Sequence, residues 1–384
     1  MEPTNSQATS PIFAIKNHGQ SIWMDNLSRN LIESGELAAL MESRDVRGIT
    51  SNPAIFEKAI AGNAIYDADI EAGIRSGQSV EQIYESLVFT DIKNACDILR
   101  PVYDQTQGLD GYVSIEVPPH LAHDTDSTIR EARRYAQTLD RPNLMIKIPG
   151  TPEGLPAVTQ AISEGIAVNV TLLFSLESYL ATAWAYIAGL EQRASRGESV
   201  AGIASVASFF LSRIDSLIDG QLDQIMAATD DADRKAKCQD LKGKVAIANA
   251  KLAYQEYHKI LQSDRWQALA AQGATMQRLL WASTSTKNPA YSDVMYVDEL
   301  VGPDTVNTLP PNTLEACADH CHVANRLEMD VEQAAATLAQ LPELGIDLDQ
   351  VMAELLEDGI TKFVQPFDAL MDSLVLKVKQ LHPA

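Results

Sequence analysis

The feature that most constrains this chain is a regular alternation of short apolar runs with longer segments of helical periodicity. Eight runs have the length and apolar character of buried strands, and helical patterns separate them. The runs cover residues 21–25, 46–50, 111–117, 143–150, 167–173, 203–209, 276–283 and 305–310. Strands that alternate with helices predict a parallel sheet, so we expect an α/β protein, a single (β/α)8 TIM barrel with additional helices.

The same pattern sets the expected domain organisation. A doubly wound sheet is the alternative architecture, and it is disfavoured because no glycine-rich phosphate loop follows any strand. Residues 1–20 are expected to be a flexible N-terminal tail, since the chain begins with a stretch rich in Ser, Thr and Asn. Residues 21–384 would then form the barrel and its C-terminal helices, with an exposed insertion at the aspartate-rich segment 227–233.

The charge balance limits the partners of this chain. It contains 30 Lys and Arg against 52 Asp and Glu, a formal charge of −22 at pH 7. Nucleic acid is not expected as a partner, because phosphate backbones require a basic surface. An anionic small substrate would need a local pocket of Arg or Lys. No apolar run reaches the roughly 20 residues of a membrane span, so no membrane partner is expected. Four cysteines in so long a chain make no disulfide framework, which predicts a reducing compartment, the cytoplasm.

The fourth run contains a lysine in an unusual setting. In the sequence Asn-Leu-Met-Ile-Lys-Ile-Pro-Gly of residues 143–150, Lys147 shares one strand face with Met145. Its amine must enter either an apolar region or a cavity. Desolvation there favours the neutral amine, the form that attacks a carbonyl carbon to make a Schiff base. The alternative is an edge-strand lysine that extends to water, and this stretch alone does not decide between them.

Polar residues gather where the strands end, which is the catalytic face of a barrel of this kind. Each has a structural alternative, such as a helix cap for Asp25 or Asn52, or a satisfied interior group for Asn169. Seven strands that each supply one at the same end favour a functional mouth over coincidence. The residues concerned are Asp25, Asn52, Glu116, Lys147, Asn169, Thr171, Ser208 and Ser283.

Amine–carbonyl catalysis fits this set. Lys147 would attack a ketone, and the resulting iminium would draw electrons from the neighbouring carbon–carbon bond. The carboxylates of Asp25 and Glu116 are available as acid and base, and we expect both to contact Lys147 mainly through substrate or water. Asn52 and Asn169 could bind hydroxyl groups, and a further threonine, Thr171, could position a water molecule. No metal or other cofactor is expected, because the iminium replaces a Lewis acid.

Five motifs of this chain resemble those of transaldolases. They are Asp-Asn-Leu-Ser-Arg at 25–29, Gly-Ile-Thr-Ser-Asn-Pro at 48–53, Val-Ser-Ile-Glu-Val around Glu116, Ile-Lys-Ile-Pro-Gly-Thr around Lys147 and Asn-Val-Thr-Leu-Leu-Phe-Ser at 169–175. The resemblance covers roughly residues 20 to 375. The sequence of this chain is most similar to the larger bacterial branch of this group, within the class I Schiff-base aldolase superfamily.

The resemblance implies an activity of the pentose phosphate pathway. A dihydroxyacetone unit would pass from sedoheptulose 7-phosphate or fructose 6-phosphate to an aldose phosphate, glyceraldehyde 3-phosphate or erythrose 4-phosphate. It implies Lys147 as the Schiff-base residue, Asp25 as acid and base for bond cleavage, and Glu116 acting through a water held with Thr171. Asn52 and Asn169 would hold the three-carbon unit. A fructose 6-phosphate aldolase that uses the same lysine is the alternative, and the oligomeric state is expected to be monomer or homodimer.

The resemblance also implies where the substrate phosphate binds. Family members use Ser and Arg on the sixth strand and its loop, which correspond to Ser208 and Arg213 here. A second Arg usually follows strand seven. This chain has Ser283 at the strand end and Lys287 in the comparable place, and a lysine supplies a point charge without the fork of an arginine.

One further motif, Cys-Ala-Asp-His-Cys-His at 317–322, allows three interpretations. Two cysteines four residues apart lie on one face of a helix. They could be structural, a redox-responsive pair or, with the adjacent histidines, part of a metal site, although the paired spacing of structural zinc sites is missing.

Overall fold

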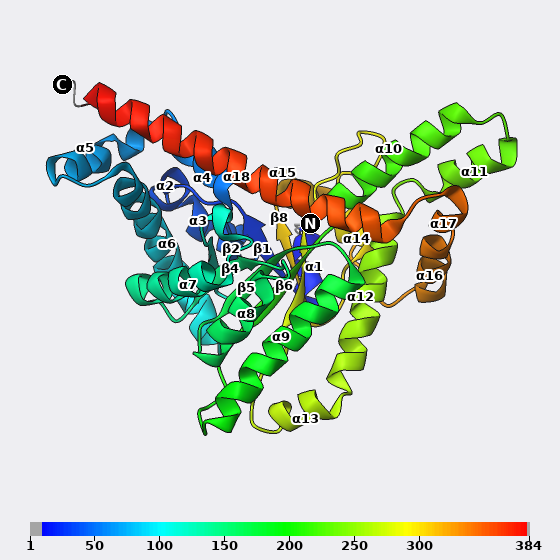
Figure 1. Cartoon of the computed structure of the whole chain (residues 1–384), viewed down its shortest axis with the longest axis horizontal. Helices are drawn as coiled ribbons and strands as arrows, with labels where there is room; N and C mark the ends of the chain where they lie inside the picture. The colour runs from blue at the N-terminus through cyan, green and yellow to red at the C-terminus, as the bar shows by residue number, and fades with distance from the viewer. Residues whose placement is uncertain (1–9, 382–384) are drawn as a thin grey trace, which may run out of the picture.

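The structure, a computed structural model that describes residues 10–381, is a closed barrel of eight parallel strands in the order β1 to β8 (Figure 1). The expected (β/α)8 TIM barrel with additional helices is therefore confirmed. The strands are β1 (Gln20–Asp25), β2 (Val46–Thr50), β3 (Val113–Glu116), β4 (Leu144–Pro149), β5 (Val168–Leu173), β6 (Ser205–Phe210), β7 (Arg278–Ala282) and β8 (Thr305–Leu309).

Helices surround the barrel on its outer side. In the first half they are α1 (Ile12–Ile15), η1 (Lys16–His18), α2 (Arg29–Glu33), α3 (Glu36–Ser43), α4 (Pro53–Ile60), η2 (Ala64–Tyr66), α5 (Asp67–Arg75), α6 (Val80–Gln105), η3 (Pro119–Leu121), α7 (Thr125–Leu139) and α8 (Gly154–Ser163). In the second half they are α9 (Leu176–Ser195), α10 (Ser212–Ala228), α11 (Ala232–Leu241), α12 (Val245–Leu261), α13 (Asp264–Ala270), α14 (Met295–Glu299), α15 (Pro311–His320), α16 (Val331–Ala339), α17 (Leu341–Leu344) and α18 (Leu348–Leu381). Among the residues described, none of these helices combines the length and apolarity needed to cross a membrane.

The expected tail at 1–20 needs correction at its C-terminal part. Residues 1–9 lie outside the described residues. Helix α1 and the 3-10 turn η1 follow, and Ile12 and Ile15 of α1 are completely buried. Two isoleucines three positions apart fall on one helix face, and burying that face stabilises the segment against the core. The expectation rested on composition and overlooked this short apolar pattern.

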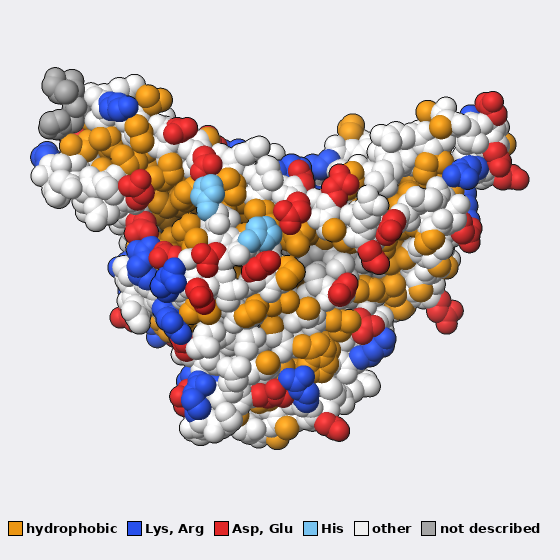
Figure 2. All heavy atoms as spheres, viewed as in Figure 1, with side chains coloured by type: hydrophobic (Ala, Val, Ile, Leu, Met, Phe, Trp, Pro, Cys, Tyr) orange, Lys and Arg blue, Asp and Glu red, His pale blue; other side chains and the backbone are white. Residues whose placement is uncertain are grey.

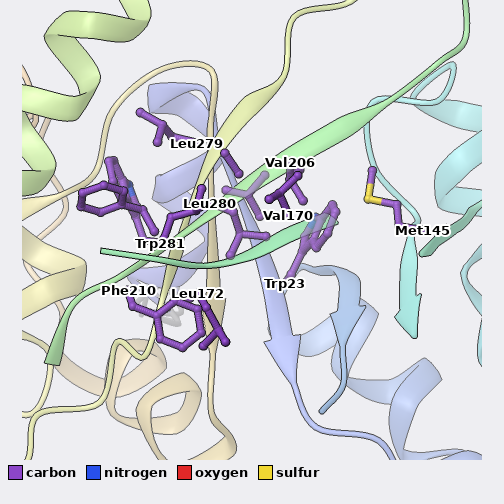
Figure 3. Packing of buried hydrophobic residues seen from close by; sticks show 14 of the residues in the cluster. Trp23, Met145, Val170, Leu172, Val206, Phe210, Leu279, Leu280 and Trp281 are labelled. Atoms are coloured by element: carbon purple, nitrogen blue, oxygen red, sulfur yellow. The ribbon is translucent and has the colours of Figure 1, made fainter. Parts of the chain in front are cut away.

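Buried apolar side chains fill the space around the strands (Figure 3). Trp23 of β1 and Trp281 of β7 are among the largest fully buried side chains, and Figure 3 shows them with Phe210 at the end of β6. A closely packed interior holds the strands at fixed positions, so the residues at the strand ends also have fixed positions. The aspartate-rich connection between α10 and α11 is exposed as predicted. Figure 2 shows acidic side chains at the outer end of these two helices, at the upper right of the view.

The register of neighbouring strands places the central polar residues at one level. Glu116 of β3 pairs with Lys147 of β4, and Lys147 pairs in turn with Asn169 of β5. Paired residues of parallel strands point to the same side of the sheet. Three polar side chains from three adjacent strands therefore stand side by side in the barrel.

The C-terminal helix α18 lies across the upper side of the molecule in Figure 1 and contacts α4, α6, α10 and β5. Gly359 of this helix sits against Leu172 and Arg213, because a Cβ built at Gly359 would stand 2.9 Å from Leu172 Cδ2 and 3.4 Å from an Arg213 nitrogen. One helical turn later, the Phe363 side chain reaches the mouth of the barrel. This helix begins more than 130 residues after β6 in the sequence, and it covers the end of β5 beside Arg213.

Candidate active site

A cavity of about 140 Å³ opens at the ends of the strands. Eight of the ten predicted site residues line it, and the other two, Glu116 and Asn169, lie in the barrel beside Lys147. The lining residues are Asp25, Thr50, Asn52, Lys147, Thr171, Ser208, Phe210, Arg213, Ala282, Ser283, Ser285, Lys287, Thr308, Pro310 and Phe363. Sequence positions spread over the whole chain therefore converge on one site.

Lys147 is the central group of this cavity, and its side chain is nearly completely enclosed, with 4% of the residue exposed. Its Nζ donates a hydrogen bond to the backbone carbonyl of Ser51 over 3.1 Å and lies 3.5 Å from Glu116 Oε2. The Phe363 ring covers the amine at 5.4 Å. Our expectation that Glu116 contacts the lysine mainly through substrate or water was wrong, because their paired register brings the two groups to ion-pair distance.

Glu116 carries an unusual proton affinity for a carboxyl group. Burial raises its pKa from 4.5 to about 7, while the positive charge of Lys147 opposes the shift. Neither carboxylate oxygen has a hydrogen-bond partner in the described part of the chain. A carboxyl that titrates near neutral pH can both give and accept a proton.

Asp25 stands at the end of β1 and is oriented by the neighbouring strand. Its Oδ1 accepts a hydrogen bond of 2.7 Å from Thr50 Oγ1, which also lies 2.7 Å from Thr308 Oγ1 of β8. Burial raises the pKa of Asp25, and both Lys147 and the Thr50 hydrogen bond oppose that shift. Its carboxylate is thus fixed by a threonine pair instead of a direct contact with the lysine.

A buried hydrogen-bonded layer lies around Asn169. Its Nδ2 donates to Ser114 Oγ over 3.1 Å, and its Oδ1 accepts from Ser208 Oγ over 2.7 Å. Asn169 is fully buried and does not line the cavity, whereas Ser208 does. The sequence alternative of a satisfied interior amide therefore describes its contacts, and through them Asn169 orients Ser208.

Thr171, two residues further along β5, differs from Asn169. Its buried Oγ1 has no hydrogen-bond partner among the described residues, and the side chain lines the cavity. The next residue, Leu172, adopts a positive φ of 63°, and the pairing of β5 with β6 shifts register at this point. The strand thus turns directly beyond Thr171, leaving its hydroxyl free for a ligand or water.

Asn52 combines the structural and functional interpretations. Its Oδ1 accepts a hydrogen bond of 3.1 Å from the backbone N–H of Ile55 and caps α4, with Pro53 in the first turn. The residue also lines the cavity, as Lys147 does. A helix cap thereby fixes a potential ligand-binding amide.

Two cations stand at the rim of the cavity. Arg213, in the first turn of α10, lies 5.2 Å from the Phe210 ring and 5.8 Å from the Phe363 ring, and one of its buried nitrogens has no hydrogen-bond partner within residues 10–381. Burial lowers the pKa of Arg213. Lys287 Nζ lies 2.6 Å from Ser285 Oγ, and burial, with the charges of Arg213 and Lys58, lowers its pKa. Neighbouring cations that repel each other are stabilised by a bound anion.

Ser283 connects the end of β7 to the first turn of α10. It adopts a positive φ of 55°, and its Oγ lies 2.8 Å from Ser212 Oγ at the start of α10. The backbone N–H of Ser212 also donates to the Ser283 carbonyl over 3.0 Å. The end of β7 and the first turn of α10 are thus held together beside Arg213.

Several lining residues were missed by sequence reasoning. Thr50 and Thr308 carry the signal that identified the others, a polar residue at a strand end, and could have been found. Phe363 has no such signal, because an aromatic residue on an amphipathic helix is the ordinary pattern of a core contact. Its place depends on how α18 lies on the barrel.

Comparisons with known proteins identify the family. Residues 22–374 match the family described as Transaldolase/Fructose-6-phosphate aldolase. A protein named Transaldolase from Trichodesmium erythraeum is 67% identical over 98% of this chain and 99% of its own length. A Transaldolase 2 from a Nostoc species is 65% identical over 98% and 100%, and a Transaldolase 1 from Streptomyces avermitilis is 47% identical over 98% of both chains. This chain therefore belongs to the transaldolase/fructose-6-phosphate aldolase family, as its motifs predicted.

Proposed function

We propose that this protein is a transaldolase that transfers a dihydroxyacetone unit from sedoheptulose 7-phosphate or fructose 6-phosphate to an aldose phosphate. The observation that carries the proposal is the arrangement of one enclosed lysine, two carboxyl groups with raised pKa and a rim of two cations around a single cavity. The near full-length identity to proteins named Transaldolase supports the same activity.

The first step assigns Lys147 as the nucleophile. Its amine adds to the ketone carbon, and loss of water gives the iminium. Glu116, 3.5 Å from the amine, is placed to take and return the protons of this step, directly or through a water bound at the free Thr171 hydroxyl. Its pKa of about 7 matches a group that works in both directions near neutral pH.

The second step assigns Asp25 to bond cleavage. Its carboxylate accepts the proton of the β-hydroxyl while the carbon–carbon bond breaks, and the electron pair moves into the iminium to give an enamine. The departing aldose phosphate leaves, an acceptor aldehyde enters, and Asp25 returns the proton as the new bond forms. The Thr50–Thr308 pair keeps this carboxylate in place through both directions. Hydrolysis of the final iminium frees Lys147.

The remaining residues bind substrate in this proposal. Asn52 and Ser208 offer hydrogen bonds to the hydroxyls of the three-carbon unit, and Asn169 acts by orienting Ser208. Arg213, Lys287 and Ser283 bind the phosphate at the rim. This local positive region accounts for an anionic substrate in a chain whose net charge is −22. Location in the cytoplasm and a monomeric or homodimeric state stay predictions.

Trapping with borohydride tests the nucleophile. Reduction in the presence of fructose 6-phosphate converts the iminium into a stable secondary amine, and peptide mass mapping locates it. We expect the three-carbon unit on Lys147, and a label on another lysine would refute the mechanism.

The reaction type is tested by assaying fructose 6-phosphate with and without erythrose 4-phosphate, because full-rate cleavage without an acceptor would indicate an aldolase instead.

A further inference from the structure

The motif at 317–322 forms a pair of sulfur atoms outside the active-site cavity. Cys317 lies in the last turn of α15 and is completely buried, and Cys321 follows the helix as its C-cap with 5% exposed. The backbone N–H of Cys321 donates to the Cys317 carbonyl, and the two Sγ atoms lie 2.9 Å apart. Both are free thiols in the structure.

The adjacent histidines point to other partners. His320 Nε2 lies 2.9 Å from Asp293 Oδ1, and His322 Nδ1 lies 3.6 Å from Asp298 Oδ2. Within residues 10–381 no group of three or more His, Cys, Asp or Glu side chains is placed to hold one metal ion. The described side chains of this motif therefore do not form a set of metal ligands. The two thiols are its remaining reactive groups.

The hydrogen bond between the thiols gives them different roles. Cys317 donates to Cys321 Sγ, and this bond lowers the pKa of Cys321 and raises that of Cys317. The charge of His320 acts in the same direction on Cys321, while burial and Asp298 oppose it. The thiolate is the reactive form in thiol–disulfide exchange. Cys96 offers the contrast, since burial raises the pKa of its thiol to about 12.

We propose that Cys317 and Cys321 form a dithiol modification site that reacts with small-molecule disulfides, with Cys321 as the attacking sulfur and Cys317 as the resolving one. Cys321 thiolate attacks one sulfur of the disulfide, which forms a mixed disulfide and releases one thiolate. Cys317 then loses its proton and attacks Cys321 Sγ, which releases the second thiol. The protein dithiol is oxidised to an intramolecular disulfide, and one disulfide molecule is reduced to two thiols.

The placement of the two residues suits this closure. Residues four apart on a helix have Cβ atoms about 5–6 Å apart, slightly more than a disulfide requires, but Cys321 has left the helix with extended backbone. The C-cap position can therefore adjust without bending α15. Neither cysteine lines the active-site cavity, so the proposal is independent of the function proposed above.

Oxidised glutathione, a small-molecule disulfide, is the probe for the test. The reduced full-length protein is incubated with it, free thiols are alkylated, and tryptic peptides are weighed. Both cysteines fall in one peptide, because no Lys or Arg lies between Lys287 and Arg326. We expect this peptide to lose the mass of two hydrogen atoms, a change that a thiol reductant reverses, while Cys96 and Cys238 remain open to alkylation after unfolding.

Variants assign the order of attack. Cys317→Ser should stop at a glutathione adduct on Cys321, and Cys321→Ser should leave Cys317 unmodified. The matched control replaces both Cys96 and Cys238 by Ser and should close the disulfide as the wild type does. Failure of the wild-type peptide to lose two hydrogens, or early glutathione adducts on Cys317 instead of Cys321, would overturn the proposal. Both of these outcomes are measured on the wild-type protein, so the proposal can be tested even if a variant fails to fold.

Discussion

The floor and the rim of the active-site cavity are built in different ways. At the floor, Lys147 lines the cavity, and Glu116 and Asn169 lie beside it at the same register level on the two adjacent strands. At the rim, Arg213 comes from the first turn of α10 and Lys287 from the segment after β7. Strand register fixes the floor groups relative to one another, whereas the rim depends on how separate segments are tied together. In the proposed function, the groups whose chemistry needs fixed distances lie at the floor, and the groups assigned to substrate binding lie at the rim.

Tyrosine–carboxylate contacts tie the rim segments to one another. Asp215 and Asp219, both on α10, accept hydrogen bonds from Tyr296 over 2.7 Å and from Tyr291 over 2.5 Å. These tyrosines belong to the segment that follows Lys287. The helix that carries Arg213 therefore also holds the chain that carries Lys287.

Loss of the floor nucleophile should have the largest effect. We expect Lys147→Met, which keeps the length and apolar stem, to lower kcat by at least about 10⁴-fold, because no other amine stands in the cavity floor. Borohydride with fructose 6-phosphate should then trap no adduct. Lys93→Met, on α6, is the control and should retain wild-type activity. Trapping at another lysine in the Lys147→Met variant would contradict the assignment.

Much of this floor could be predicted from sequence. Lys147, Asn169 and Thr171 sit in apolar runs whose two-residue period fixes which side chains share a face. A barrel brings the ends of all its strands together, so residues far apart in sequence could be assigned to one mouth. The direct Lys147–Glu116 contact could not be foreseen in this way, because it depends on the register between two strands and not on the pattern within either.

The second prediction concerns the acid–base group of the floor. Glu116→Gln should lower kcat/KM by about 10²-fold at pH 8, because the amide cannot accept a proton. The pKa of Glu116 is about 7, so wild-type kcat/KM should rise as pH increases through 7, and this limb should be missing in the variant. A pH profile of both proteins from 5.5 to 8.5 provides the measurement. An unchanged limb near pH 7 in Glu116→Gln would assign it to another group.

Burial of Glu116 also predicts an effect on stability. Its folded-state pKa is raised from 4.5 to about 7, so the folded protein binds this proton more tightly than the unfolded chain. Relative to Glu116→Gln, the wild type should therefore be most stable below pH 4.5 and lose free energy of unfolding as pH rises through 7. Urea unfolding at several pH values measures this difference. A difference that grows in favour of the wild type with rising pH would contradict it.

At the rim, we expect an effect on KM instead of kcat. Arg213→Lys should raise KM for fructose 6-phosphate about 10- to 100-fold, since a charge-assisted hydrogen bond contributes roughly 1.5–3 kcal/mol and a lysine cannot form the bidentate fork. Lys287→Met should raise KM only a few fold, because Lys287 is only partly buried and water screens part of its charge. Unphosphorylated fructose is the control substrate, and its KM should not change. Equal increases for both sugars would exclude phosphate binding at the rim.

The rim was less predictable from sequence than the floor. Arg213 and Lys287 were expected only through the resemblance to a family, since neither follows from strand alternation. Phe363, which covers both Lys147 and Arg213, lies on α18 and was missed. Its position follows from the close approach of that helix at Gly359, a tertiary contact that leaves no local pattern.

The smallest effect is expected where the rim is held by a single hydrogen bond. Tyr291→Phe removes the contact to Asp219 but keeps the ring, which lies against Gly243 at a distance that leaves no room for a Cβ there. The segment carrying Lys287 should then be less firmly held, and KM for fructose 6-phosphate should rise about threefold with kcat unchanged, the effect of one hydrogen bond of about 0.5–1.5 kcal/mol.

Tyr112→Phe is the matched control, because it removes a buried tyrosine hydroxyl that donates to Gly108 far from the strand ends that form the cavity. If the rim is a set of tied segments, only Tyr291→Phe should change KM, and adding it to Lys287→Met should cause no further change, because the residue it positions is already gone. Additive effects of the two substitutions would instead mean that Tyr291 supports Arg213 through α10. The double variant thus distinguishes a rim in which Tyr291 positions only the Lys287 segment from a rim in which that segment and Arg213 shift together with α10.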